Sequence, residues 1–256
     1  MKLQNKIVII TGGGRGLGRA VALAFAREGA KVVLAARTRD EVEHVAEELR
    51  AIRKEVLAVP ADVSREDQVD HLVQKTLETY GTIDILVNNA GSRGPIAPIR
   101  DISLADWEET LRVNLTSAFL CIKAVLPTLM EKKQGKIINV ASTLNPRPNL
   151  TPYMVTKAGM IQLTKQLARE LKEFNIQVNA VHPGVMDTRM QEEIRKAGPR
   201  AIGTDMFDRL KEEGMLHSPS EPAKLILYLA SAAADGINGE YLSFDDKEVK
   251  FLIAQP

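Results

Sequence analysis

The sequence predicts a single α/β domain: a doubly wound parallel sheet of seven strands with helices on both faces. The first observation is a regular alternation of short, β-branched apolar runs with helical segments along the 256 residues, which is typical of parallel βαβ units. The second is that no linker, repeat or low-complexity tract divides the sequence. Its length suits one large domain, which we expect to span residues 1–256.

Each expected strand is a short apolar run, the pattern of a strand buried on both faces of a parallel sheet. The first, Lys6–Thr11 (KIVIIT), leads directly into a glycine cluster. The others are expected at residues 30–36, 55–60, 83–87, 135–140, 176–181 and 240–244.

The segments between these runs carry apolar residues at helical spacing. The first helix is expected to follow the glycine cluster at residues 12–14 and to continue to Glu28. Further helices are expected at residues 40–53, 65–80, 103–111, 114–133, 152–174 and 221–234.

Two segments fall outside this alternation. Residues 186–218 are rich in glycine, methionine and charge, and we expect a mobile lid over a substrate site. Residues 247–256 form a tail (KEVKFLIAQP) after the last strand. Disorder is common at a terminus, but the apolar patch Phe251-Leu252-Ile253 favours docking, and we expect it to pack on a neighbouring subunit.

Composition excludes several classes of function. Thirty-four Lys and Arg against thirty-three Asp and Glu leave a charge of +1, which gives no electrostatic reason to expect a nucleic acid or an anionic membrane as partner. The single Cys121 and four histidines without ligand spacing predict no disulfide and no metal site. We see no signal peptide and no apolar run near the roughly 20 residues of a membrane span, so we expect a cytoplasmic protein.

The glycine-rich loop TGGGRGLG (11–18) joins the first expected strand to the first expected helix. A dinucleotide pyrophosphate needs a tight turn, close approach of the backbone and free N–H groups at a helix N-terminus. Gly12, Gly16 and Gly18 can supply these, although their spacing differs from the commoner G-x-G-x-x-G. A flexible turn is the alternative, but the position after the first strand favours a nucleotide site.

The choice of nucleotide depends on the end of the second expected strand. An acidic residue there would bind the adenosine ribose of NAD, but the sequence AARTR (35–39) has no carboxylate before Asp40. Arg37, with Arg15 of the glycine loop, can instead contact a 2′-phosphate, because a guanidinium matches phosphate oxygens. We therefore expect NADP(H) rather than NAD(H). The alternative is that Arg37 and Arg39 are only the solvated end of a strand.

Tyr153 and Lys157 stand four residues apart in TPYMVTKAG (151–159), which reads as a helix start with Thr151 as N-cap. Side chains at this spacing share one helix face. The ammonium is expected to lower the pKa of the phenol and make it a proton donor and acceptor. Taken alone, the pair is more often a surface lysine and a half-buried tyrosine that share a helix face, and the rest of the chain is what favours the catalytic interpretation.

Together these residues resemble the short-chain dehydrogenase/reductase family, nearest in look to its 3-oxoacyl-[acyl-carrier-protein] reductase-like branch. The matching motifs are TGGGRGLG (11–18), Asp62-Val63, NNAG (88–91), Asn114, Ser142, Tyr153-x-x-x-Lys157 and PGVMDT (183–188). The resemblance covers nearly the whole chain. It implies a Rossmann fold and interconversion of a ketone and a secondary alcohol.

The resemblance also implies roles for single residues. Tyr153 would exchange a proton with the substrate oxygen, Lys157 would lower its pKa and hold the nicotinamide ribose, and Ser142 would hydrogen-bond the carbonyl. Asn114 would hold a water that links Lys157 to solvent, although a buried structural asparagine is the alternative. Cofactor-binding residues are implied at Gly12, Arg15, Gly16, Leu17, Gly18, Arg37, Asp62, Val63, Asn89, Ala90, Gly91, Tyr153, Lys157, Pro183, Gly184, Val185 and Thr188.

Two departures from the family pattern stand out. Ser142 precedes Tyr153 by 11 residues, slightly fewer than the family spacing, so Thr143 is a possible substitute. The last strand runs YLSFDD (241–246), where the family usually has a glycine pair after an acidic residue.

The sequence supports two functions of different class. The first is an oxidoreductase acting on a small carbonyl or alcohol substrate, and the second is a nucleotide-binding sensor or structural subunit without turnover. The joint presence of Tyr153, Lys157 and Asn114 favours the enzyme.

Other features bear on the substrate and on assembly. Met186, Met190 and Met206 in the lid suit an adaptable pocket or dock the lid on the core. Arg93 and Arg147 could contact an anionic group, but we expect them to be solvated. The helices at 114–133 and 152–174 resemble the family's dimer surface, which implies a homodimer or homotetramer.

Overall fold

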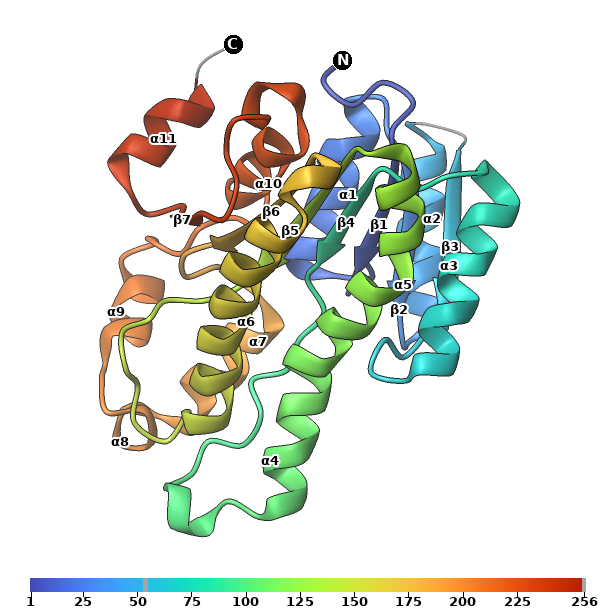
Figure 1. Ribbon diagram of the computed structural model, residues 1–256. Helices are drawn as coiled ribbons and strands as arrows, with labels where there is room; N and C mark the ends of the chain where they lie inside the picture. The colour runs from blue at the N-terminus through green and yellow to red at the C-terminus, as the bar shows by residue number, and fades with distance from the viewer. Residues whose placement is uncertain (53–54, 255–256) are drawn as a thin grey trace.

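Seven parallel strands form one sheet in the order β3-β2-β1-β4-β5-β6-β7. The computed structural model describes residues 1–52 and 55–254, and Figure 1 shows helices packed on both faces of this sheet. The strands are β1 (Ile7–Thr11), β2 (Lys31–Ala36), β3 (Val56–Pro60), β4 (Ile85–Asn88), β5 (Gly135–Val140), β6 (Ile176–His182) and β7 (Tyr241–Ser243). The predicted fold class is confirmed, and every predicted strand is present.

Helices alternate with the strands and continue through the predicted lid and tail. They are α1 (Gly16–Arg27), α2 (Arg39–Arg50), α3 (Glu66–Tyr80), α4 (Leu104–Leu111), α5 (Ser117–Lys132), α6 (Thr151–Glu170), α7 (Arg189–Ala197), α8 (Pro199–Ile202), α9 (Met206–Glu212), α10 (Pro222–Ala230) and α11 (Lys247–Ala254). The predicted end of α2, Arg53, lies outside the described residues. Thr151 is the first residue of α6 and not its N-cap, which is Leu150.

Alternate residues of each strand join two separate core layers, because successive side chains point to opposite faces of a sheet. Val8 and Ile10 of β1 pack in the layer with α1, α2 and α10. Ile9 packs in the opposite layer with α3, α5 and the end of α6. Burial on both faces explains why these strands read as continuous apolar runs in the sequence.

The two helices predicted at 103–111 and 114–133 are one continuous helix. A π-helical turn, η2 (Arg112–Thr116), joins α4 to α5, and π turns of this kind are frequent at functional sites. The continuous helix Leu104–Lys132 has 29 residues and is long and apolar enough to cross a membrane. The expectation that no such segment exists is therefore wrong on length and composition. We interpret it as a core helix, since α5 packs on β4, β5 and α3.

The predicted lid is helical and partly docked. Ile202 of α8 and Phe207 of α9 are buried, and the Arg147 guanidinium carbon lies 5.5 Å from the centroid of the Phe207 ring. The expectation that Arg147 is solvated is therefore wrong, because the aromatic face attracts the cation.

The predicted tail forms α11 and packs on α10 of its own chain. Val249 is buried and Ile253 packs on the core, whereas Phe251 is 71% exposed. Residues four apart share a helix face, and a residue midway between them points away. The expectation that the whole apolar patch packs on a neighbouring subunit is thus wrong for Ile253. The last two residues of the tail, 255 and 256, lie outside the described residues.

The sheet also decides where a ligand can bind. The strand order reverses between β1 and β4, which are neighbours in the sheet. In an open parallel sheet, ligands bind in the crevice at the carboxyl ends of the strands at this switch point. The glycine-rich loop follows β1 and NNAG follows β4, so the two predicted cofactor segments lie side by side.

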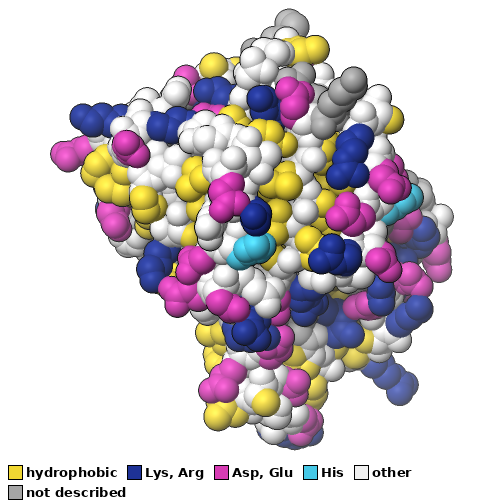
Figure 2. Space-filling view, turned by 90° about the vertical axis from the view of Figure 1, so that its right-hand side faces the viewer, with side chains coloured by type: hydrophobic (Ala, Val, Ile, Leu, Met, Phe, Trp, Pro, Cys, Tyr) yellow, Lys and Arg dark blue, Asp and Glu magenta, His cyan; other side chains and the backbone are white. Residues whose placement is uncertain are grey.

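Surface charge agrees with the balanced composition. On the face shown in Figure 2, Lys and Arg side chains are interspersed with Asp and Glu, and no continuous field of one sign covers that face.

Candidate active site

A cleft of about 640 Å³ lies at the carboxyl ends of the central strands. Most of the predicted site residues line it, namely Gly12, Arg15, Gly16, Leu17, Arg37, Asp62, Val63, Asn89, Ala90, Gly91, Tyr153, Lys157, Pro183 and Thr188. Five predicted residues are not among the lining residues: Gly18, Asn114, Ser142, Gly184 and Val185. The structure therefore brings fourteen of the predicted residues together in one cleft, from segments far apart in the chain.

The glycine-rich loop brings the backbone close to the cleft. Gly12 and Gly16 have φ of +64° and +53°, a region that side chains rarely allow. A Cβ on Gly18 would lie 2.1 Å from the carbonyl oxygen of Gly12, so only glycine lets α1 approach β1 this closely. Gly18 is thus a packing residue behind the loop.

The two predicted cofactor segments are tied to each other. The Asn89 side chain donates to the carbonyl oxygens of Thr11 and Gly12 at 2.9 and 3.1 Å. The Thr11 hydroxyl accepts from the N–H groups of Asn89 and Ala90, both at 3.0 Å. Thr11 was missed as a positioning residue, although it is the first letter of the quoted motif.

The loop fits the pyrophosphate of a dinucleotide. No side chain caps the N-terminus of α1, so the N–H groups of its first turn have no side-chain acceptor there. A Cβ on Gly16 would meet only Thr188 of the lid, at 3.7 Å. The two segments therefore face each other with room between them.

Lys157 and Tyr153 lie together at the other end of the cleft. The Lys157 Nζ is 5.8 Å from the centroid of the Tyr153 ring and donates to the Val140 carbonyl at 2.6 Å. Lys157 is buried, and burial lowers its pKa to about 8. Both residues project from the first turns of α6 on one face, as the four-residue spacing predicts.

The pKa of Tyr153 differs from the expectation. Burial raises the pKa of its phenol, and a hydrogen bond with the Ser142 side chain opposes the rise only in part. The expectation that Lys157 lowers this pKa is therefore wrong for the protein on its own. Desolvation outweighs the hydrogen bond with Ser142, since burial disfavours the charged form of the phenol.

The Ser142 side chain lies beside Tyr153 despite its short spacing from it in the sequence. Its side chain hydrogen-bonds Tyr153, and its carbonyl oxygen accepts from the Tyr241 hydroxyl at 2.9 Å. Thr143, the possible substitute, has its hydroxyl oxygen 3.1 Å from the N–H of Asn145, which it accepts in a local turn. The structure thus favours Ser142 over Thr143.

Asn114 lies in the middle of the π-helical turn η2 and is fully buried. Its Oδ1 accepts from the N–H of Ser92 at 2.6 Å, and its Nδ2 donates to the Ser92 carbonyl at 2.8 Å and to the Thr156 hydroxyl at 3.1 Å. Asn114 therefore clamps the loop after Gly91 beside Lys157. Ser92 and Thr156 were missed, although Thr156 directly precedes Lys157.

The opposite end of the cleft carries the residues expected to recognise the adenosine part of a cofactor. Burial would raise the pKa of Asp62, but hydrogen bonds from Ser64 and the charges of Arg112 and Arg37 lower it overall. Arg15 forms an ion pair with Glu41, a cleft residue that the sequence analysis missed. Glu41 is the carboxylate directly after Asp40, in the first turn of α2.

Arg93 also departs from its expected solvated state. Its Nε lies 3.3 Å from Glu193 of α7, and Glu193 in turn pairs with Arg189. Arg93 and Glu193 both line the cleft, so this ion pair connects the loop after β4 to the lid.

The second departure from the family pattern has a structural counterpart. Asp245, two residues after the end of β7, lies 2.9 Å from His217 and 3.6 Å from His182. The backbone N–H of His217 donates to the Val185 carbonyl at 2.9 Å. Asp245 and His217 therefore contact Gly184 and Val185 on the side away from the cleft, and neither of these two residues lines it.

Comparison with known proteins agrees with this geometry. The family model for short chain dehydrogenases matches residues 6–199. The chain belongs to the short-chain dehydrogenase family. As a member of this family it is an oxidoreductase, and the resemblance inferred from its motifs is confirmed.

Among the similar proteins, the (2S)-[(R)-hydroxy(phenyl)methyl]succinyl-CoA dehydrogenase subunit BbsD of Thauera aromatica is 37% identical over 94% of this chain and 96% of its own. A 3-oxoacyl-[acyl-carrier-protein] reductase from Synechocystis sp. is 38% identical over 97% of this chain and 99% of its own. The expected similarity to that branch of the short-chain dehydrogenases is confirmed.

Solved structures of similar fold differ in their cofactors. An actinorhodin polyketide ketoreductase variant with NADPH has a TM-score of 0.88 and 30% identity, covering 93% of this chain and 95% of its own. An NAD+-bound xylitol dehydrogenase has a TM-score of 0.87 and 29% identity, covering 95% and 98%. The short-chain dehydrogenase fold thus accommodates either nicotinamide dinucleotide.

Proposed function

We propose that this short-chain dehydrogenase is an NADP(H)-dependent oxidoreductase that interconverts a ketone and a secondary alcohol, with Tyr153 as proton donor and acceptor. The observation that carries the proposal is that Tyr153, with the Ser142 side chain beside it, and Lys157 lie at one end of a cleft that the glycine-rich loop also lines; Tyr153 and Lys157 line the cleft themselves. Proton donor, orienting groups and nucleotide cradle are thus within one site.

The chemistry divides between the cofactor and the chain. When bound, the nicotinamide would exchange a hydride with the substrate carbon. Ser142 would place and polarise the substrate oxygen, and Tyr153 would deliver the proton to it. The raised pKa of Tyr153 keeps the phenol protonated near neutral pH, which is the state needed to reduce a carbonyl.

Lys157 would both hold the cofactor and stabilise the charge that forms on Tyr153. One of its three N–H donors is used by the Val140 carbonyl, so the others can hold hydroxyls of a nicotinamide ribose. Its cation would stabilise negative charge on the Tyr153 oxygen after proton transfer. Asn114 would keep the neighbouring Ser92 loop in place, and a water on its remaining acceptor site would serve proton resupply.

Charge supports NADP(H) over NAD(H). Arg37 and Arg15 both line the cleft beyond the end of β2, where an NAD-preferring site would carry an acidic residue. Arg37 is exposed, and its guanidinium can meet a 2′-phosphate in a forked geometry.

The proposal includes an assembly and a location. The exposed side chains of Phe119 on α5 and Val155 on α6, at 50% and 44% of their area, support a homodimer or homotetramer through these helices. We propose that it works in the cytoplasm. Light scattering of the purified chain would measure the oligomer mass, and a monomer would contradict the assembly.

The test is a turnover assay that follows NADPH absorbance with a panel of ketones, including β-ketoacyl thioesters, diketones, quinones, sugars and steroids. NADH is run in parallel, and Tyr153→Phe serves as the blank. We expect turnover that prefers NADPH and falls by two to four orders of magnitude in Tyr153→Phe, about the share of general acid catalysis. Faster turnover with NADH would overturn the cofactor assignment. Binding of NADPH without turnover on the whole panel would instead favour a nucleotide sensor.

A further inference from the structure

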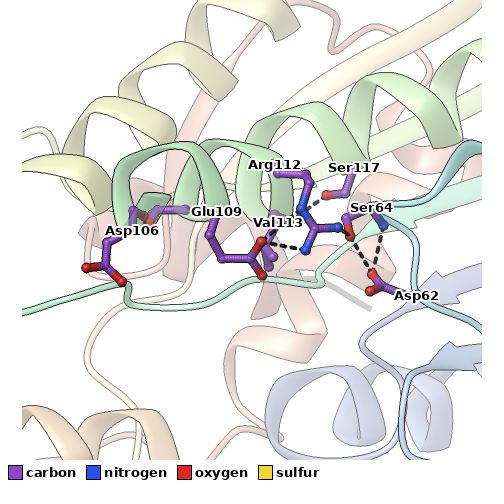
Figure 3. A network of polar contacts seen from close by, with 8 residues as sticks. Asp62, Ser64, Asp106, Glu109, Arg112, Val113 and Ser117 are labelled. Carbon is purple, nitrogen blue, oxygen red and sulfur yellow. Dashed lines mark hydrogen bonds and ion pairs between the residues drawn. The ribbon is translucent and has the colours of Figure 1, made fainter. Parts of the chain in front are cut away.

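The strongest unexplained feature of the site is a chain of polar contacts that leads from Asp62 to the π-helical turn η2, shown in Figure 3. Asp62 lines the cleft. Its Oδ1 accepts two hydrogen bonds from Ser64, one from the backbone N–H at 3.1 Å and one from the hydroxyl at 2.6 Å. Within the part of the chain that the structure describes, Oδ2 accepts no hydrogen bond.

Ser64 is held in turn by Arg112. The Arg112 Nη1 donates to the Ser64 hydroxyl oxygen. A hydroxyl has a single hydrogen, so once it is given to Asp62, only its lone pairs remain for Arg112. A guanidinium does not lose its proton in proteins. The two hydrogen bonds therefore have a fixed direction: Arg112 donates to Ser64, and Ser64 donates to an ionised Asp62.

Arg112 is itself aimed by a second acid. Its Nε lies 2.8 Å from Glu109 Oε2, and its Nη2 also donates to that oxygen. Glu109 lies one turn earlier, on α4. The guanidinium is thus held by its Nε edge, which leaves Nη1 pointing at Ser64.

The π-helical turn places Arg112 beside the catalytic end as well. Val113 lines the cleft, and Asn114 clamps Ser92. The Ser117 hydroxyl donates to the Val113 carbonyl at 2.6 Å, which gives a carbonyl of the turn a partner. Three consecutive residues of η2 therefore contact three parts of the site. Arg112 contacts the segment after β3, Val113 lines the cleft, and Asn114 contacts the loop after β4.

We propose that Arg112 is a positioning residue for the cofactor base: through Ser64 it fixes the Asp62 carboxylate so that its second oxygen accepts a hydrogen bond from an amino group of that base. This inference rests on the proposed nucleotide-dependent function. It assigns a role in binding to a residue that does not itself line the cleft.

The experiment compares two dinucleotides that differ at one group. Binding of NADP+ and of its purine analogue, in which hydrogen replaces the 6-amino group, is measured by titration calorimetry on the full chain. The analogue has no N–H at that edge to donate to the Asp62 carboxylate, so the wild-type protein should prefer NADP+ by about tenfold or more, the usual effect of a hydrogen bond to a charged group.

In Arg112→Met the preference for NADP+ should fall at least about threefold, with little change in the affinity for the analogue. Ser64→Ala should give the same result, because it removes the relay. Arg65→Met is the matched control, since Arg65 is exposed on the same segment and pairs with Asp67. The control should keep the wild-type preference.

A pH series separates positioning from a loss of packing. Arg112 and Arg37 both lower the pKa of Asp62, so removing Arg112 should raise it. On acidification, Arg112→Met should therefore lose its residual preference at a higher pH than the wild-type protein. A purely structural defect would weaken both dinucleotides equally at every pH.

The outcomes distinguish this inference from the function on which it rests. If the wild-type protein binds neither dinucleotide, both are overturned. If Arg112→Met keeps the full wild-type preference for NADP+, only the role of Arg112 is overturned. Should Arg112→Met fail to fold, Arg112→Lys keeps the charge but cannot bridge Ser64 and Glu109, and an unchanged preference in that variant would also refute the role.

Discussion

The Arg15 guanidinium and the Glu41 carboxylate form an ion pair at the edge of the cleft, with 3.2 Å between Nη1 and Oε1. The two residues come from the glycine-rich loop and from the first turn of α2, and both line the cleft. Of the two arginines that the sequence offers to a 2′-phosphate, Arg15 and Arg37, the first is therefore already paired with a carboxylate. Glu41 should compete with the phosphate for Arg15.

Glu41→Gln should strengthen the use of NADPH. Without the carboxylate, Arg15 is free for the phosphate, and the KM for NADPH should fall about two- to threefold, a modest change because the pair is exposed to solvent. The KM for NADH, which lacks the phosphate, should stay the same. Glu48→Gln is the matched control, because Glu48 lies on the same helix as Glu41 and pairs with Arg19 of α1. Equal changes for both cofactors would contradict the competition.

Ser142 and Thr143 can be told apart by a pair of alanine variants. Ser142→Ala removes the hydroxyl that hydrogen-bonds Tyr153, so kcat should fall about 100- to 1000-fold, as for other lost donors to a developing oxyanion. Thr143→Ala removes only the acceptor for the Asn145 N–H and should keep kcat within about twofold. The reverse order of the two kcat values would assign the serine role to Thr143.

The buried cation of Lys157 should make stability depend on alkaline pH. Its pKa in the folded protein is lowered to about 8 from the usual 10.5, so between these values this side chain is more fully protonated in the unfolded chain than in the folded one. The contribution of Lys157 to the free energy of unfolding, measured as the difference between the wild-type protein and Lys157→Met, should then rise as pH rises from 8 to 10.5, by up to about 3 kcal/mol.

Urea unfolding at a series of pH values measures this contribution. Lys157→Met should lack the rise and should be the more stable protein at pH 7, where the wild-type chain keeps a desolvated charge. Lys165→Met is the control, because Lys165 is exposed on the same helix, and it should keep the wild-type rise. A wild-type stability that falls steadily over this range relative to Lys157→Met would rule out the lowered pKa.

The two faces of α11 should respond differently to truncation of a side chain. Val249→Ala removes buried apolar atoms that pack on α10 and should lower the free energy of unfolding by about 1–2 kcal/mol. Phe251→Ala removes an exposed ring and should leave the stability of the subunit within about 0.5 kcal/mol. A fall in oligomer mass for Phe251→Ala would show that this ring contacts another subunit. Equal losses in the two variants would contradict the orientation of the helix.

Local sequence was enough to predict the sheet and the position of the cleft. Each strand is a short apolar run because both faces of the sheet are covered, and glycine at Gly12 and Gly16 marks the turn that only this residue adopts easily. Tyr153 and Lys157 could be paired from their spacing because a helix brings residues four apart onto one face. The continuity of α4 and α5 was missed, because a π turn has no simple sequence signal.

The sequence by itself therefore determined the fold class, the glycine-rich loop and the Tyr153–Lys157 pair, all of which depend on neighbours a few residues apart. Only the tertiary structure decided the pKa of Tyr153, the pairing of Arg15 with Glu41 and the relay from Arg112 to Asp62. Burial and charge at each of these groups come from segments distant in sequence, such as Ser64 and Arg112, which are 48 residues apart. Their effects depend on how closely the segments approach one another, and local periodicity does not encode that distance.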